Sequence, residues 1–105
     1  MGQFTLHENS NRNTREAFPY LLDVQAPLLA DLNTRVVVPV ANRTSLTGKP
    51  ISHLCPVIEY DGQAWVLYTQ QLAGVPLTAL GKEVADMSGY RNEIINAIDF
   101  LVTGV

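Results

Sequence analysis

The fold is decided at the carboxyl end of the chain, where residues 88–105 read SGYRNEIINAIDFLVTGV. Apolar residues recur there at intervals of three and four, which places them on one face of a helix. They are Ile94, Ile95, Ile98, Leu101 and Val102. Ser88 is a favourable N-cap and Gly104 a natural stop, so the pattern predicts a helix over about residues 88–102. This helix either closes the core or, because it ends at the surface, presents its last turn to solvent.

The residues ahead of this helix, 2–80, predict a series of short strands. Residues 3–7 and 18–25 alternate apolar and polar side chains, as strands with one buried face do. Residues 35–40 contain four valines and also Pro39. Because proline lacks a backbone donor, we expect a bulge or a sheet edge at that position.

The strongest local signal is the pair Asp61-Gly62, which lies between two apolar runs at residues 57–60 and 64–68. It predicts a two-residue hairpin with a primed turn. Five or more strands joined by turns and followed by one helix predict a mainly β protein, curved into a small antiparallel barrel. We expect residues 1–105 to form one domain.

Composition restricts the class of protein further. Of the 105 residues, 47% are hydrophobic and 16% charged, which is typical of a globular domain and leaves apolar surface for a homodimer interface. The net charge of −3 argues against independent binding to nucleic acid. The sequence lacks a signal peptide and an apolar run of about 18 residues, so we expect a cytoplasmic protein that makes no membrane contact.

The sequence offers little for catalysis or metal binding. His7, His53 and Cys55 do not have the spacing of a zinc site. His53 and Cys55 are two residues apart and would share one face of a strand, but a small buried thiol is the more common outcome. We therefore expect no enzymatic activity, no metal and no cofactor.

Four of the seven basic residues fall in two polar connections. They are Arg12, Arg15, Arg43 and Lys49. If the fold brings these connections together, they form a basic patch on an acidic protein, which suits an acidic peptide partner. The alternative is that the connections are polar only because they are solvated.

Eight segments of the chain keep the order and spacing found in one known family. They are Gln3-Phe4, Asp23-Val24-Gln25, residues 35–40, Leu54-Cys55-Pro56-Val57, and residues 75–81, 83–88, 91–94 and 96–98. The most specific is Val84-Ala85-Asp86, at the junction before the helix. With these segments the chain resembles the CcdB family of bacterial toxin–antitoxin toxins.

The resemblance implies a homodimer of SH3-like barrels, each with a C-terminal helix. It also implies a target, the A subunit of DNA gyrase, which CcdB-like toxins hold on cleaved DNA without being enzymes themselves. A CcdA-like antitoxin neutralises such toxins, and the two proteins together repress their operon. Operator DNA would be contacted only through the antitoxin, and the four basic residues are the candidates for antitoxin contact.

The resemblance places the gyrase-binding surface at the end of the helix and on the loop after the second strand. In this chain the residues are Leu28, Leu29, Asp99, Val102, Thr103, Gly104 and Val105. The best-known members end in Trp-Gly-Ile, whereas this chain has Thr103 at the tryptophan position. Losing an aromatic anchor commonly costs over about 2 kcal/mol, or roughly 30-fold in affinity.

Two alternatives stay open. A MazF-like mRNA endoribonuclease shares the barrel and would need an acid and a base in a basic groove, for which His53 and Arg35 are the candidates. A binding module that takes the antitoxin but no longer acts on gyrase is the second alternative, and Thr103 is its main support.

Overall fold

Asp61 and Gly62 turn the chain back on itself in the manner expected from the sequence. In the computed structural model, which describes residues 2–43 and 53–104, their φ angles are 54° and 75°. A type I′ turn requires positive φ at both positions. The turn joins β4 (Val57–Tyr60) to β5 (Gln63–Leu67) and pairs Tyr60 with Gln63, so the predicted two-residue hairpin is confirmed.

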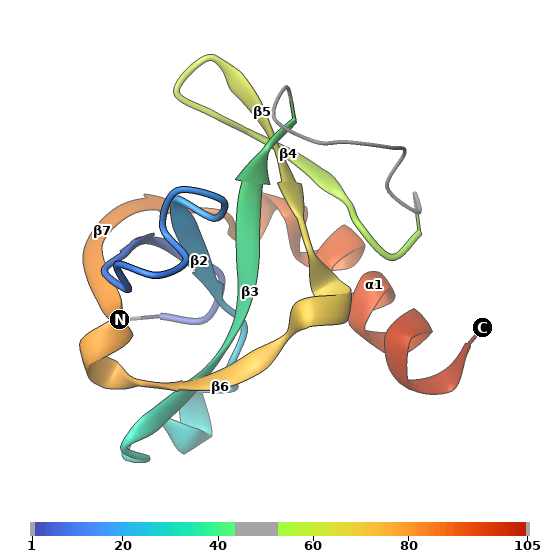
Figure 1. Ribbon diagram of the computed structural model, residues 1–105. Helices are drawn as coiled ribbons and strands as arrows, with labels where there is room; N and C mark the ends of the chain where they lie inside the picture. The colour runs from blue at the N-terminus through green and yellow to red at the C-terminus, as the bar shows by residue number, and fades with distance from the viewer. Residues whose placement is uncertain (1, 44–52, 105) are drawn as a thin grey trace.

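The described residues form one antiparallel sheet followed by one α-helix (Figure 1). The strands not yet named are β1 (Thr5–Asn9), β2 (Tyr20–Asp23), β3 (Thr34–Asn42), β6 (Ala73–Pro76) and β7 (Leu80–Asp86). Their order in the sheet is β4-β5-β3-β2-β1-β7, and β6 pairs with β3. Figure 1 shows the sheet curling into a half-barrel, which confirms the mainly β, SH3-like fold with one C-terminal helix.

The first two strands are shorter or displaced relative to the sequence pattern. The first was expected over residues 3–7, but Phe4 has a φ of 67° and β1 begins only at Thr5. The second was expected over residues 18–25 and is confined to Tyr20–Asp23. Residues before and after β2 belong instead to hydrogen-bonded connections on either side of it.

The core lies between one face of the sheet and the helix. Alternate residues of the first three strands point into it, including Leu6, Leu22 and Val38, each buried completely or nearly so. Ile94 of the helix is packed in the same cluster. Burying one such side chain contributes about 1.5–3 kcal/mol, so this apolar face is what holds the helix on the sheet.

Pro39 sits in neither a bulge nor an edge strand, so the expectation from the sequence is wrong. β3 is central, with β2 on one side and two different strands on the other: β6 along residues 34–37 and β5 along residues 40–42. Pro39 falls where the partner changes, and its carbonyl accepts a hydrogen bond from Tyr68 N at 2.9 Å. The proline nitrogen, which has no hydrogen to donate, therefore faces the gap between β6 and β5, where no ladder bond is lost.

β7 is a strand that the sequence pattern did not predict, since strands were expected to end near residue 80. It pairs with β1, matching Leu6 with Ala85 and His7 with Glu83, and the register shifts on both sides of His7. Gly81 lies at this irregular pairing, where a Cβ atom would come 2.9 Å from the carbonyl oxygen of Glu8. The contact is possible only because residue 81 has no side chain.

The helix begins later than predicted. A 3₁₀ turn, η5 (Ser88–Tyr90), comes first, and α1 covers Arg91–Thr103. Ser88 is not the N-cap of α1, because Tyr90 occupies that position; the backbone N–H of Ser88 donates to Oδ1 of Asp86 at 2.9 Å. Gly104 ends the helix as expected, with a φ of 75° and its N–H bonded to the carbonyl of Phe100.

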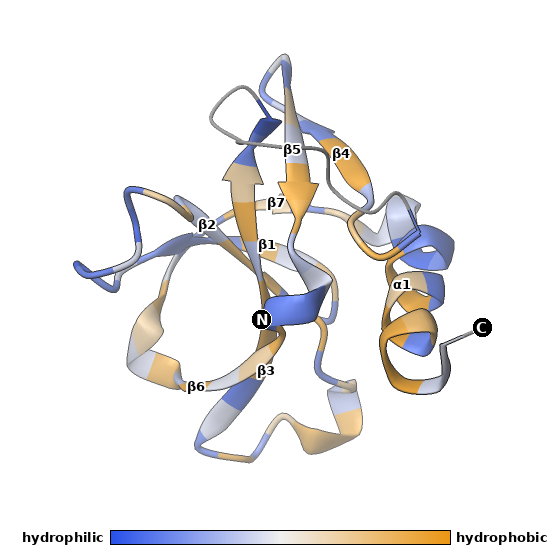
Figure 2. Cartoon of the chain, turned by 45° about the vertical axis from the view of Figure 1, so that its right-hand side comes forward, coloured by the Kyte–Doolittle hydropathy of each residue, from blue (hydrophilic) through white to orange (hydrophobic). Residues whose placement is uncertain are grey.

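Only the first part of α1 is buried. Ile94 and Ala97 are fully buried and Ile95 and Ile98 partly, whereas the last apolar positions are exposed. The last turn, which Figure 2 colours as hydrophobic, runs past the sheet (Figure 1), so both interpretations of the sequence hold for part of the helix: its first half closes the core and its last turn faces solvent. No helix in the described ranges is long and apolar enough to cross a membrane.

Candidate functional site

The loop after β2 presents leucine side chains to solvent. It contains the short helix η1 (Pro27–Leu29), in which Leu28 is 96% exposed and Leu29 about half exposed. Leu32, just beyond, is half exposed as well and was not among the residues expected from the sequence. An apolar residue as exposed as Leu28 contributes nothing to the core, so this loop has the character of a contact surface.

Gln25 fixes this loop to the sheet. Its buried side chain donates from Nε2 to the carbonyl of Leu29 at 2.7 Å and accepts at Oε1 from the backbone N–H of Val36 at 3.0 Å. The two bonds tie the end of η1 to β3. Leu28 is therefore held outward by a residue that is itself buried.

Gln25 is in turn held by a buried ion pair. Asp23 Oδ1 accepts the backbone N–H of Gln25 at 3.0 Å, and Asp23 Oδ2 accepts Nε of Arg35 at 3.1 Å. Both charged side chains are almost completely inaccessible to solvent. A buried pair tolerates loss of neither partner, because the remaining charge would have no counterpart. The sequence resemblance included Asp23 and Arg35 but gave no sign that they support this loop.

The end of α1 is the second exposed apolar site. Val102 is 76% exposed, and Asp99, Thr103 and Gly104 are exposed beside it. Thr103 Oγ1 donates to the carbonyl of Asp99 at 2.7 Å, so its hydroxyl group is turned back onto the helix. Val105 lies outside the described residues.

The loop and the helix end do not form one continuous surface within a single chain. Figure 1 shows η1 at the foot of the sheet, behind β6, and the end of α1 at the right-hand side of the molecule. The expected gyrase-binding residues therefore fall into two separate groups in one protomer.

The basic residues lie at one end of the sheet. Arg12 and Arg15 are exposed on the connection from β1 to β2, and Arg43 is exposed directly after β3. Tyr20 at the start of β2 pairs with Val40 near the end of β3, so both connections leave the sheet at the same end. Lys49 lies outside the described residues.

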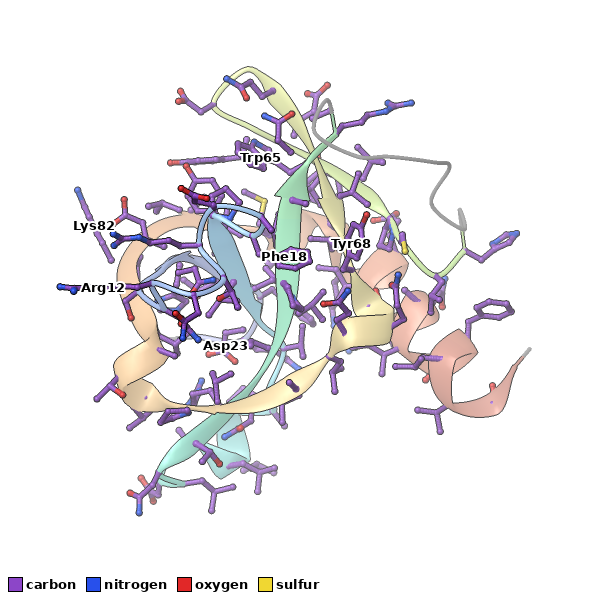
Figure 3. The ribbon with its side chains drawn as sticks, viewed as in Figure 1. Arg12, Phe18, Asp23, Trp65, Tyr68 and Lys82 are labelled. Carbon is purple, nitrogen blue, oxygen red and sulfur yellow. The ribbon has the colours of Figure 1, made fainter. Side chains whose placement is uncertain are left out.

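Arg15 lines a polar hollow of about 450 Å³ together with Glu8, Tyr20 and Gly81. The hollow brings β7 next to the basic connection, so Lys82 joins Arg12 on this side of the molecule, where both project outward (Figure 3). The sequence did not indicate Lys82, because β7 was not expected to be a strand. Burial raises the pKa of Tyr20, and the nearby charges of Tyr60, Glu8 and Asp61 raise it further.

His53 and Cys55 do not form a reactive pair. They lie in a turn rather than on a strand: His53 is exposed with its ring 6.2 Å from that of Phe100, while Cys55 is buried and its thiol donates to Oε1 of Gln70. The expectation of a buried thiol is confirmed. Over residues 2–43 and 53–104, no group of three or more His, Cys, Asp and Glu side chains could hold a metal ion.

Comparison with known proteins agrees with the fold and identifies the family. A solved structure described as "Crystal structure of Mtb toxin" matches with a TM-score of 0.70, covering 91% of this chain and 98% of that chain. Only 13% of the aligned residues are identical, so this match concerns the fold alone. The family model described as "CcdB protein" matches residues 3–104. The chain therefore belongs to the CcdB family, the toxins of toxin–antitoxin systems.

Proposed function

We propose that this toxin binds the A subunit of DNA gyrase and traps the enzyme on cleaved DNA. The observation that carries the proposal is the exposure of Leu28 on a loop fixed from beneath by Gln25, Asp23 and Arg35. An exposed leucine held by a buried polar network is ordered before binding, so little conformational entropy is lost when a partner covers it.

The end of α1 supplies the second half of the surface. Val102 and Gly104 are exposed, and the side chain of Thr103 adds no aromatic contact. The loop and the helix end lie apart in one protomer. The proposal therefore includes a homodimer, in which two copies related by a two-fold axis present each group twice.

The proposal includes an antitoxin partner. Arg12, Arg15, Arg43 and Lys49 are the candidates for binding a CcdA-like antitoxin. The net charge of −3 favours operator binding through the antitoxin, with which the toxin would repress its own operon in the bacterial cytoplasm.

The toxin is proposed to act by binding rather than by catalysis, without a cofactor. The endoribonuclease alternative required His53 and Arg35 in one groove. Arg35 is buried and paired with Asp23, whereas His53 is exposed beside α1, so these two side chains do not share a site.

Binding to purified gyrase A subunit, measured by calorimetry, tests the proposal. Leu28→Glu places a charge at the exposed leucine and is expected to weaken binding by roughly 30-fold or more. Ala17→Glu adds the same charge on the exposed connection from β1 to β2 and serves as the matched control, with an affinity equal to that of the unchanged protein.

Two results would count against the proposal. Equal affinity of Leu28→Glu and Ala17→Glu would remove the loop from the interface. If the unchanged protein bound the antitoxin but not gyrase, the chain would be an antitoxin-binding module that has lost its action on gyrase.

A further inference from the structure

A small apolar hollow lies on the face of the sheet opposite the main core. Its floor consists of Leu21 from β2 and Val37 and Pro39 from β3, and its volume is about 170 Å³. Leu21 and Val37 are neighbours in sequence of the core residues Leu22 and Val38, and successive strand residues point to opposite faces. The hollow is therefore separate from the core under α1.

The walls of the hollow explain why it is not filled. On one side β6 and η4 (Leu77–Ala79) contribute Ala73, Val75 and Ala79, whose side chains are too short to reach across. On the other side stands Phe18, at the end of the connection from β1 to β2.

The second wall is held in place by hydrogen bonds. Asn9, which is buried, donates from Nδ2 to Oγ1 of Thr14 at 3.0 Å and to the carbonyl of Phe18 at 2.9 Å. The ring of Phe18 packs edge-on against Tyr68, with centroids 5.3 Å apart, and both are labelled in Figure 3. The connection is thereby fixed above the sheet, and the hollow exists before any ligand arrives.

The size of the hollow suits one apolar side chain. Apolar cavities of about 150 Å³ in proteins bind benzene, and the atoms around such a space lack contacts that a filling group restores. A leucine or phenylalanine side chain of a partner falls within this size.

The charges next to the hollow indicate what accompanies that side chain. The polar hollow lined by Arg15 shares Asn9 with the apolar one, so the two hollows are adjacent. Arg12 and Lys82 project outward nearby, while Glu8 is the one acidic residue on the wall of the polar hollow. Among the residues that the structure describes, Arg15 is the one basic residue on that wall. A guanidinium group offers two parallel N–H donors to a carboxylate, so Arg15 favours an acidic residue on the partner.

We propose that the apolar hollow receives one aliphatic or aromatic side chain of the antitoxin, while an acidic residue of the same antitoxin segment binds at Arg15. The inference rests on the proposed function, in which a CcdA-like antitoxin is the partner. It adds the chemistry of the contact: an apolar residue with an acidic neighbour, bound by two adjacent hollows that share Asn9.

The test compares two Ala→Leu variants in binding to the cognate antitoxin, measured by surface plasmon resonance. Ala73→Leu adds three carbon atoms to the wall of the hollow and is expected to weaken binding about 10-fold or more. Ala30→Leu makes the same change at an exposed residue after η1 that lines neither hollow, and its affinity is expected to stay within about 2-fold of that of the unchanged protein. Thermal unfolding establishes that both variants are folded.

A second measurement needs no variant. The methyl groups of Leu21, Val37 and Val75 are observed by NMR in the unchanged protein, with and without antitoxin. Nuclear Overhauser contacts from these methyls to an antitoxin side chain are expected. Antitoxin binding without such contacts, or equal affinity of Ala73→Leu and Ala30→Leu, would overturn the inference while keeping the antitoxin as a partner. Absence of antitoxin binding to the unchanged protein would overturn both.

Discussion

Arg35 and Asp23 meet in the interior of the sheet, with Nε of the arginine 3.1 Å from Oδ2 of the aspartate and both side chains buried. The aspartate uses its other oxygen to hold Gln25, and Gln25 holds the loop that presents Leu28. An ion pair on β2 and β3 thus determines the position of an exposed leucine several residues away.

Asp23→Ala is expected to destabilise the protein by about 3–5 kcal/mol, because it leaves the Arg35 guanidinium buried without a counter-charge. Urea unfolding followed by circular dichroism measures the loss. Asp31→Ala removes an exposed aspartate and is expected to change the free energy of unfolding by less than about 0.5 kcal/mol. Similar values for the two variants would mean that the pair does not hold the sheet.

How far the sequence predicts this fold depends on how local the signal is. The hairpin at Asp61-Gly62 follows from two adjacent residues and was predicted correctly. The pairing of β1 with β7 joins Leu6 to Ala85, far apart in sequence, and its register shifts twice, so periodicity could not reveal it. The position of Pro39 depends on where β6 gives way to β5, which is again a property of the assembled sheet.

In the candidate site, too, local features were predicted from the sequence and features that depend on distant residues were not. The stop at Gly104 was expected from the helix pattern, and the structure agrees. That pattern counted Val102 as part of the apolar face, and only the resemblance placed it on a surface, where it is 76% exposed. The resemblance included Leu28 but could not show that Gln25 fixes its loop. Lys82 was not predicted because its strand, β7, was not predicted. The apolar hollow could not be predicted because it depends on the distance between β6 and the connection from β1 to β2.

Stability is expected to depend on the ionisation of Tyr20 at high pH. Burial raises the pKa of Tyr20 in the folded protein above the ordinary tyrosine value of about 10, so the folded state holds this proton more tightly than the unfolded chain does. The free energy of unfolding is therefore unaffected below pH about 10 and falls as the pH rises from there through the raised pKa. Unfolding midpoints across this range measure the effect.

Tyr20→Phe supplies the control for this dependence. It keeps the ring that packs edge-on against Trp65, with centroids 4.9 Å apart, and removes the ionisable hydroxyl group. The variant is expected to lose stability less steeply above pH about 10, whereas Tyr90→Phe leaves Tyr20 intact and should follow the unchanged protein. An unaltered slope in Tyr20→Phe would show that another group is responsible.

Arg15→Glu is expected to slow association with the antitoxin about 10-fold at low ionic strength, because it reverses a charge on the wall of the polar hollow. The difference should shrink at high salt, where exposed charges are screened. Stopped-flow mixing at two salt concentrations measures both rates. Arg91→Glu makes the same charge change on α1, and an equal slowing in that variant would show that only net charge matters.

Thr103→Trp is expected to strengthen binding to the gyrase A subunit, by up to roughly 30-fold, since it adds an aromatic anchor beside the exposed Val102 and Gly104. Calorimetry measures the gain. Thr34→Trp makes the same change at an exposed residue of β3 and is the matched control, with an affinity equal to that of the unchanged protein. A tryptophan at residue 103 that left the affinity unchanged would mean that gyrase does not contact the end of α1.

The most direct test of the central proposal is a cleavage-trapping assay with purified gyrase, supercoiled plasmid and ATP. The full chain is compared with a chain that lacks residues 103–105, after thermal unfolding has shown that both are folded. The proposal predicts linear DNA on addition of detergent with the full chain and none with the shortened one. Folded full-length protein that trapped no cleaved DNA would contradict it.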